Sequence, residues 1–167
     1  MILNRQRRIR VPTEKLRRFL MRAQEQLHLP ADSLTVCLVS DAEIACWNRA
    51  YRRKTGPTDV LSFPADAKIR TPRTQGSRRT PKKAAQRQKY RETPDLNSAD
   101  ARQYLGDIAI APAVARRNAL RFGRTFEDEM RILILHGMLH LMGYDHETDA
   151  GQMDRRERRE RRMLGLA

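Results

Sequence analysis

The hydrophobic positions near the start of the chain predict an amphipathic helix. They follow segment 12–14 and are Leu16, Phe19, Leu20, Ala23 and Leu27. A recurrence every three or four residues is the period of one helix face, so we expect these side chains to pack against a core. Arginines occupy the opposite face, which we expect to be solvated.

The pattern then changes to that of a strand, a helix and a second strand. The apolar run 34–39 predicts a short strand, and Ser40 with Glu43 three residues later forms a capping box that opens a helix. After a polar loop, residues 60–63 predict a second strand that ends at Pro64. The first half of the chain therefore combines both element types.

The second half begins with another strand and continues with helices. The apolar run 105–111 predicts a buried strand, and Pro112 starts a helix that ends at Gly123. Thr125 caps the next helix, in which acidic residues of the first turn complement the helix dipole. This helix carries an apolar stripe and ends at Gly143.

A last helix is predicted from about Asp149 to Leu164. Its inward residues are expected to be Met153, Met163 and Leu164. Its outward face is expected to show arginines interleaved with glutamates, namely Arg155, Arg156, Glu157, Arg158, Arg159, Glu160, Arg161 and Arg162.

Charge and composition add a second feature. The chain has 167 residues with 34 Lys+Arg against 20 Asp+Glu, a net charge of +14 that suits an anionic partner. We expect one catalytic domain over residues 1–167, because this length and 40% hydrophobic residues allow one core. A basic segment from Lys68 to Thr93 lacks large apolar residues, which predicts a disordered insertion at about 68–100. It is either solvated without a specific role or a cationic arm that binds phosphates.

Cysteine usage and the N-terminus indicate the compartment. Cys37 and Cys46 lie in a predicted strand and helix, not in a metal-binding spacing, so we expect thiols with a structural role. The basic start of the chain is followed by no apolar segment of the kind a secretory signal contains. No apolar run near the histidines approaches the roughly 20 residues of a membrane span. The sequence therefore predicts a cytoplasmic protein that does not bind membranes.

Three of the four histidines, His136, His140 and His146, fall in one short stretch. Positions i and i+4 project from one helix face, so the first two can point at one ion, and Gly143 lets the chain turn to bring in the third. Three imidazoles leave the fourth tetrahedral position of zinc for water, whose pKa then falls to about 7. This predicts a catalytic site with one Zn²⁺ per chain, whereas the isolated His28 is expected to be structural.

The same spacing occurs in metzincin peptidases, whose signature is H-E-x-x-H-x-x-G-x-x-H. The ligands and the glycine match, but Gly137 stands where the general-base glutamate would be. A peptidase therefore stays an alternative, but one that lacks the general base its reaction needs. A reaction that needs charge neutralisation at phosphate is the better candidate.

In its histidine motif and in several further blocks, the chain resembles the YbeY-type endoribonucleases, the bacterial rRNA maturation factors. Residues 136–146 reproduce the signature H-G-x-L-H-L-x-G-Y-D-H, and further blocks of the family occur in order at 47–52, 57–64 and 105–108. The resemblance implies an α+β fold, a single α/β-type domain with a small mixed β-sheet flanked by helices and a zincin-like metal helix. It also implies a zinc-dependent, single-strand-specific endoribonuclease that acts in rRNA maturation, at the 3′ end of small-subunit rRNA, and in ribosome quality control.

The resemblance assigns roles to individual residues. His136, His140 and His146 would bind Zn²⁺, and His136 and Arg52 would be catalytic. The guanidinium of Arg52 would contact the scissile phosphate, with a bidentate fork suited to developing negative charge. Without the resemblance, we would interpret Arg52 as a surface arginine beside Arg53 and Lys54.

Four further residues have two interpretations each. Asp107 and Asp145 could orient a histidine by a hydrogen bond, or they could cap and pair structurally. Tyr144 and Phe63 could stack on bases, or they could belong to the core.

Two departures from the family concern the partners. The basic insertion is longer than usual, and the last helix is rich in arginine where relatives tend to be more acidic, so contacts with single-stranded RNA and ribosomal particles could differ; no DNA partner is expected. A non-catalytic, zinc-stabilised ribosome-assembly factor is the second functional hypothesis.

Overall fold

The computed structural model describes residues 1–65, 104–145 and 149–166. Its elements are β1 (Ile2–Asn4), α1 (Thr13–Gln26), β2 (Leu34–Leu38), α2 (Asp41–Trp47), the π-helix η1 (Asn48–Arg52), β3 (Val60–Pro64), β4 (Gly106–Ile110), α3 (Pro112–Arg121), α4 (Phe126–Leu141) and α5 (Gln152–Met163). The predicted basic insertion at 68–100 and the third histidine of the cluster, His146, lie outside the described residues. Every helix and strand expected within them is present.

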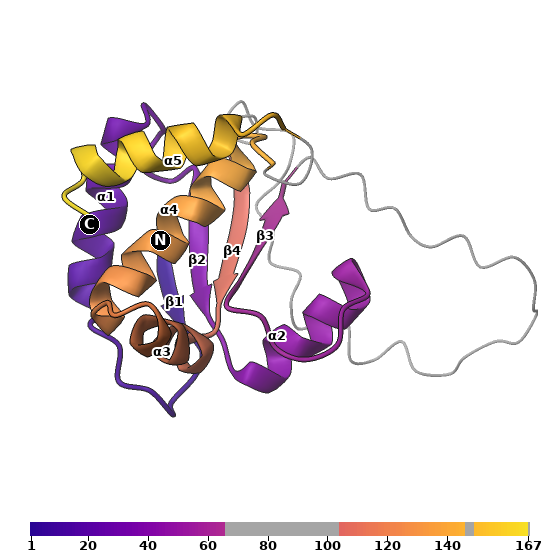
Figure 1. The fold of residues 1–167 in the computed structure, drawn as a ribbon. Helices are drawn as coiled ribbons and strands as arrows, with labels where there is room; N and C mark the ends of the chain where they lie inside the picture. The colour runs from indigo at the N-terminus through magenta and orange to yellow at the C-terminus, as the bar shows by residue number, and fades with distance from the viewer. Residues whose placement is uncertain (66–103, 146–148, 167) are drawn as a thin grey trace, which may run out of the picture.

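The sheet has four strands in the order β1-β2-β4-β3 (Figure 1). β1 and β4 run parallel to β2, whereas β3 runs antiparallel to β4. The predicted α+β fold with a small mixed sheet is thereby confirmed. The sequence pattern missed β1, whose three residues are too few to show an alternation.

β3 and β4 can approach closely because of one glycine. Gly106 pairs with Pro64 across the two strands and has a φ of +139°. A Cβ at this position would lie 2.1 Å from the carbonyl oxygen of Phe63. Only glycine fits here, since no side chain tolerates a backbone atom at that distance.

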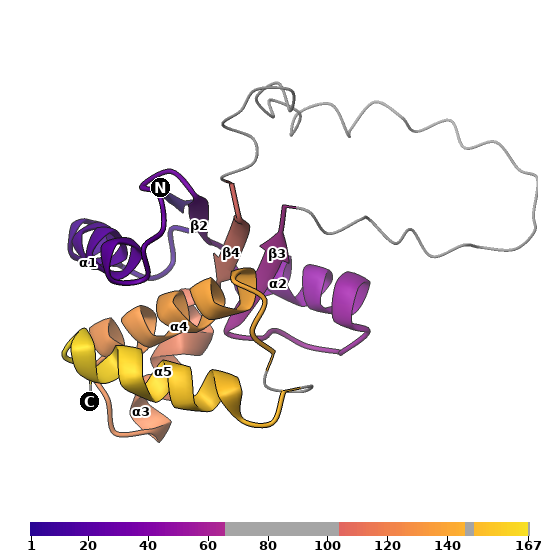
Figure 2. The same cartoon turned by 90° about the horizontal axis from the view of Figure 1, so that it is seen from above.

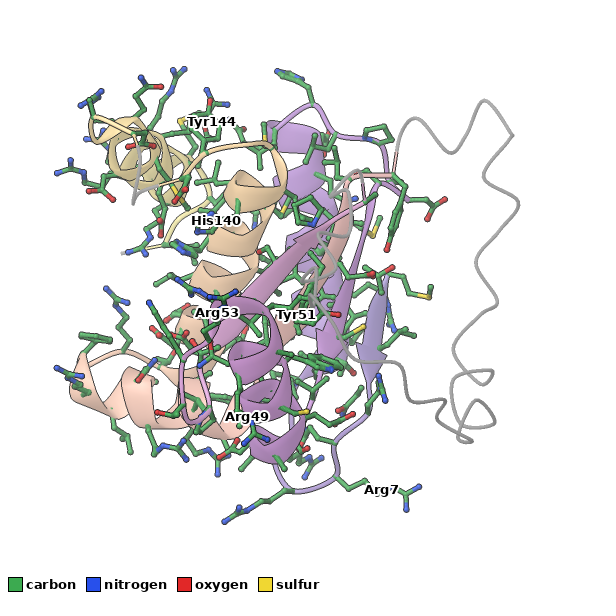
Figure 3. All side chains as sticks on the ribbon, turned by 90° about the vertical axis from the view of Figure 1, so that its right-hand side faces the viewer. Arg7, Arg49, Tyr51, Arg53, His140 and Tyr144 are labelled. Atoms are coloured by element: carbon green, nitrogen blue, oxygen red, sulfur yellow. The ribbon has the colours of Figure 1, made fainter. Side chains whose placement is uncertain are left out.

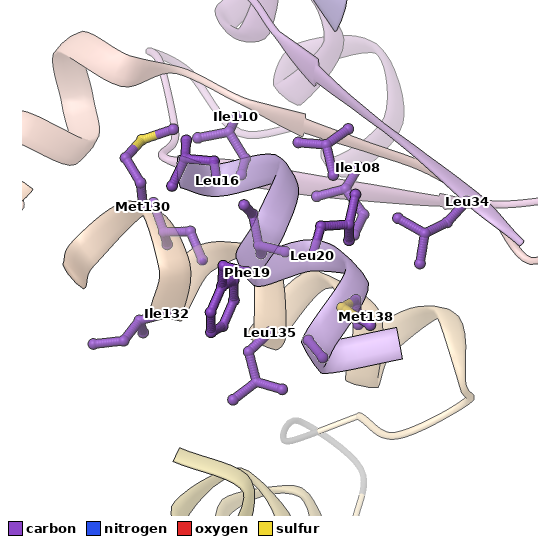
Figure 4. Packing of buried hydrophobic residues seen from close by; sticks show 14 of the residues in the cluster. Leu16, Phe19, Leu20, Leu34, Ile108, Ile110, Met130, Ile132, Leu135 and Met138 are labelled. Carbon is purple, nitrogen blue, oxygen red and sulfur yellow. The ribbon is translucent and has the colours of Figure 1, made fainter. Parts of the chain in front are cut away.

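The main core lies between one face of the sheet and the helices α1 and α4. Figure 4 shows side chains of α1 interleaved with those of α4 beneath the strands; the labelled residues are Leu16, Phe19, Leu20, Leu34, Ile108, Ile110, Met130, Ile132, Leu135 and Met138. All ten are buried. The predicted helix stripe of residues 16–27 therefore faces the core as expected.

A smaller cluster covers the other face of the sheet. It joins α2 to the strands through Val39, Ile44, Leu61, Ala109 and Ala111. Seen from above, α2 lies beside β3 while α4 lies on the opposite side of the sheet, with α5 outside it (Figure 2). α4 contacts β3, β4, α1, α3 and α5, so it is the helix on which most of the fold converges.

α5 corrects the expected orientation of its residues. Met163 was expected to be inward but is 62% exposed, whereas Glu157 and Glu160 were expected to be outward but are 8% and 1% exposed. Each glutamate pairs with an arginine four residues away on α5, Arg161 and Arg156 respectively. Buried carboxylates are tolerated when they are paired and hydrogen-bonded, and here both conditions hold.

The described helices include none with the length and apolar character needed to cross a membrane. The cysteines occupy the predicted elements, Cys37 in β2 and Cys46 in α2, and both are free thiols. His28 lies just past α1 with a φ of 55°, so it sits in the turn that ends this helix.

Candidate active site

His136 and His140 point at each other from successive turns of α4. Their Nε2 atoms are 3.1 Å apart, and their ring centroids are 4.7 Å apart with an interplanar angle of 76°. The i, i+4 spacing predicted this convergence, and both residues lie within the α-helix α4. The side chain of His136 is 25% exposed, so the pair is accessible from solvent.

This geometry fits a shared metal ion. Two nitrogens bound to one zinc at roughly 2.0–2.1 Å and near the tetrahedral angle lie about 3.3 Å from each other. The observed separation of 3.1 Å needs only a few tenths of an ångström of adjustment. The described residues contain no group of three metal-ligating side chains, and the predicted third ligand, His146, is not among these residues.

Glu157 of α5 fixes the orientation of the His136 ring. Its Oε2 lies 3.0 Å from Nδ1 of His136, and its Oε1 accepts a hydrogen bond from Arg161. A carboxylate on Nδ1 keeps a proton on that atom and leaves the lone pair of Nε2 for a cation. Glu157 is thus an orienting residue that the sequence pattern did not predict.

Glu157 remains ionised in this setting. Burial alone would raise the pKa of its carboxyl, but the hydrogen bond and charge of His136 and the charge of Arg161 outweigh it, so the pKa is lowered. A signal for this residue existed in the sequence. Glu157 lies four residues after Met153 and seven before Leu164, on the same helix face as these two buried residues.

The two aspartates proposed to orient a histidine occupy different places. Asp107 alternates along β4 with Ile108, whose side chain faces α4, so Asp107 lies on the other face of the sheet. There it accepts a hydrogen bond from Tyr104 at 2.7 Å; burial raises the pKa of Tyr104 to about 12, and this bond adds to the rise. The structure therefore does not bring Asp107 to the histidines. Asp145 follows α4, and its carbonyl accepts from the backbone of Asp149.

Gly137 is required by packing rather than by the site. A Cβ at this position would lie 2.7 Å from Cγ2 of Ile108. α4 rests directly on β4 here, and the hydroxyl of Ser62 in β3 donates to the Gly137 carbonyl at 3.3 Å. A glutamate at this position would force the buried Ile108 side chain to move and would overpack the helix on the sheet, which argues against the metzincin alternative.

Arg52 is the last residue of η1, which follows α2 directly in the chain. The segment is a π-helix, a form that often marks functional sites. The buried Asn48 opens it and donates to the carbonyl of Gly56 at 3.0 Å, which ties the segment to the following loop. Figure 3 shows Arg49, Tyr51 and Arg53 of this region on the viewer's side, with His140 on α4 above them. Arg52 itself is exposed.

The aromatic candidates Phe63 and Tyr144 belong to the core, the second of their two interpretations. Phe63 is half-buried and packs with the smaller cluster, edge-to-face on Trp47 at a centroid distance of 5.8 Å. Tyr144 packs against the main core.

Comparison with known proteins decides the family. The model of the endoribonuclease YbeY family matches residues 1–165 of this chain. The chain belongs to the endoribonuclease YbeY family. The family relation explains why the histidine pair, the η1 segment and the β3 and β4 blocks occur together, and it confirms the resemblance noted from the sequence.

Individual relatives agree with this assignment. Endoribonuclease YbeY of Solibacter usitatus is 37% identical over 153 residues, which cover 90% of this chain and 78% of the relative. Endoribonuclease YbeY of Koribacter versatilis is 33% identical over 166 residues, which cover 99% and 86%. A solution structure from Thermotoga maritima aligns with a TM-score of 0.52 and 25% identity over 98% of this chain and 89% of the other. The chain is by family a hydrolytic nuclease that acts on RNA.

Proposed function

We propose that this YbeY-family nuclease uses one Zn²⁺ held by His136, His140 and His146. It acts on single-stranded RNA in rRNA maturation, at the 3′ end of small-subunit rRNA, and in ribosome quality control. The observation that supports the metal is the 3.1 Å approach of the two Nε2 atoms, with Glu157 on the other nitrogen of His136. Neutral imidazoles leave the ion its full charge, which suits a phosphodiester substrate.

The protein side of the chemistry is electrostatic. Zn²⁺ would polarise a phosphate oxygen or lower the pKa of a water molecule. Arg52 carries a permanent positive charge and would offer its guanidinium to the phosphate as negative charge develops. Glu157 would hold the His136 ring in one tautomer while this happens.

The proposed partners and location follow from the proposed substrate. Ribosomal particles and their RNA are the proposed partners, and the cytoplasm is the proposed location. The net charge of +14 supports an anionic polymer as the partner, since it raises the rate of encounter with one.

The deciding experiment joins a metal analysis to an RNA-cleavage assay. Wild-type protein is expected to hold one zinc per chain and to cut single-stranded RNA, and His140→Ala is expected to lose both. His28→Asn is the matched control, because His28 lies outside the site in a left-handed turn that asparagine tolerates. Full cleavage by metal-free His140→Ala protein would refute the proposal. Identification of the product ends shows whether water or a ribose hydroxyl attacks.

Arg52 is tested separately from the metal. Arg52→Glu should keep its zinc while cleavage falls by about two orders of magnitude or more, since one charge contact in the transition state is worth about 2.7–4 kcal/mol. Arg18→Glu, on the exposed face of α1, is the control for the same charge change. Unchanged turnover of Arg52→Glu would mean that another cation serves the phosphate.

The same experiments separate the alternative functions. A non-catalytic assembly factor predicts that removing zinc unfolds the protein and that no purified preparation cleaves RNA. A peptidase predicts digestion of casein, which the packing of Gly137 on Ile108 argues against.

A further inference from the structure

The η1 region exposes an aromatic ring among positive charges. Tyr51 is 68% exposed, although tyrosine is a residue that usually buries most of its ring. Arg49 and Arg53 on either side of it are exposed, and neither has an ion-pair partner in the part of the chain that the structure describes. We call these three residues the η1 surface (Figure 3).

The ring of Tyr51 is held in place from one side. It packs against Phe63 with a centroid distance of 5.2 Å and an interplanar angle of 74°. Phe63 is in turn packed edge-to-face on Trp47. Tyr51 is therefore supported by a half-buried aromatic cluster and loses little conformational freedom when a ligand stacks on it.

A second exposed aromatic residue, Phe122, provides a contrast. Phe122 is 54% exposed, but guanidinium groups of Arg121 and Arg124 lie over its ring at 5.6 and 5.3 Å. Among the described residues no cation lies over the ring of Tyr51. Of these two aromatic residues, Tyr51 is therefore the one whose ring has a face available for a ligand.

The η1 surface is linked to the histidine pair through β3. Phe63 of β3 packs against Tyr51. The residue before it in the strand, Ser62, donates a hydrogen bond from its hydroxyl to the carbonyl of Gly137. Gly137 is the neighbour of His136. A ligand at the η1 surface would thus lie across one strand from the proposed metal site.

We propose that the η1 surface binds single-stranded RNA next to the cleaved bond, with Tyr51 stacking on an unpaired base and Arg49 and Arg53 binding the flanking phosphates. The inference rests on the proposed function for its substrate. A base in a duplex is covered on both faces by its neighbours, whereas a single strand can present a free face to an aromatic ring. The surface would therefore select single strands.

The test is a binding titration with a short single-stranded RNA that carries one 2-aminopurine, whose fluorescence is quenched on stacking. Tyr51→Phe should bind and quench like wild type. Tyr51→Leu should keep its packing on Phe63 and its melting temperature but lose the quench and bind about 5- to 100-fold more weakly. Tyr51→Ala should show the same loss, and Phe122→Leu, the matched control, should show none. Gel analysis after each titration ensures that the signal comes from intact RNA.

Salt dependence separates stacking from charge. Arg49→Gln and Arg53→Gln should each lower the slope of log Kd against log salt by about 0.7, because one phosphate contact releases fewer counterions. Tyr51→Leu should weaken binding at every salt concentration without changing this slope. Binding of duplex RNA should be the same for wild type and Tyr51→Leu.

Three outcomes would overturn the inference. In the first, Tyr51→Leu binds single strands as tightly as wild type does. In the second, 2-aminopurine is still quenched by Tyr51→Leu. In the third, Tyr51→Leu loses as much affinity for duplex RNA as for single strands. The first would also be expected if the η1 surface docked a protein instead of RNA. If the wild-type protein held no zinc or did not cleave RNA, the proposed function would be refuted. The binding results could still be interpreted, since they require no turnover.

Discussion

Two regions of α5, about one turn apart, each contain a buried glutamate paired with a partly exposed arginine, and they use this pair differently. Glu157 pairs with Arg161 and Glu160 pairs with Arg156, each over four residues of the helix. The second oxygen of Glu157 contacts His136 of α4, whereas that of Glu160 accepts from Gln26 of α1 at 3.3 Å. The glutamate and its arginine are equivalent in both regions, so the difference lies in the third partner.

This comparison separates a functional from a structural use of a buried carboxylate. Glu160 joins α5 to α1 through the neutral amide of Gln26, so we expect it to affect how firmly the two helices dock. Glu157 joins α5 to a proposed metal ligand, where its charge acts on the lone pair of the imidazole. The same residue type therefore predicts a catalytic defect at one position and a stability defect at the other.

Of the changes that test this comparison, Glu157→Ala is expected to have the largest effect, and that effect is on catalysis. Without the carboxylate, His136 loses the acceptor that holds its ring, and we expect zinc affinity and RNA cleavage to fall by about 10- to 100-fold. Initial cleavage rates and competition with a zinc-binding dye measure the two quantities. Glu160→Ala is the control and should cleave within about twofold of wild type, in the range of an unperturbed site. Equal losses in both variants would contradict the comparison.

Glu160→Ala should instead lower the free energy of unfolding by about 1–2 kcal/mol, because a buried hydrogen-bonded carboxylate is lost. Only part of the Arg156 side chain, 31%, is exposed, and this partial exposure limits the cost of leaving its charge without Glu160. Urea unfolding of the metal-free protein measures the change. A cleavage defect in this variant at a temperature where it is fully folded would show that the two regions are not distinct.

Glu157→Gln separates the charge of the carboxylate from its shape. The amide oxygen can still accept from Nδ1 of His136, but it lacks the negative charge that strengthens the bond. We expect a loss of about 1 kcal/mol, or about fivefold in cleavage, which is smaller than that of Glu157→Ala. A loss as large as that of the alanine variant would mean that charge alone matters.

The smallest effect is expected for Gln26→Ala, which removes the third partner of Glu160. Gln26 donates at 3.3 Å, so the loss should be about 0.5–1 kcal/mol of unfolding free energy, the lower part of the range for a single hydrogen bond. Thermal unfolding followed by circular dichroism measures it. Cleavage should not change, and a change would indicate that α1 communicates with the histidines.

Local signals in the sequence predicted much of the fold. The Ser40 and Glu43 capping box forms as expected, with the hydroxyl accepting from the Glu43 amide at 3.2 Å, and Thr125 caps α4 through the Asp128 amide at 3.0 Å. Such caps depend only on residues three positions apart, which is why a sequence pattern reveals them. β1 was missed because Ile2–Asn4 is a strand only by pairing with β2.

In the histidine site, too, some features follow from local sequence and others from tertiary packing. The spacing of His136 and His140 sufficed to predict that their rings converge, since an α-helix repeats every 3.6 residues wherever it lies. Glu157 is 21 residues after His136 in the chain, and its burial and its hydrogen bond to His136 depend on how α5 packs on α4. Asp107 was a reasonable candidate from its neighbours, but the pleat of β4 turns it to the opposite face from Ile108.

The amino-acid order alone was thus enough to establish the helices, three of the strands, the histidine pair and the family resemblance, because each depends on residues close together in the chain or on a continuous motif. Packing between distant elements established which carboxylate orients His136, why Gly137 has no side chain, and which aromatic ring has a free face. These features depend on burial and contact between segments, and the energy of such contacts is absent from any short window of sequence.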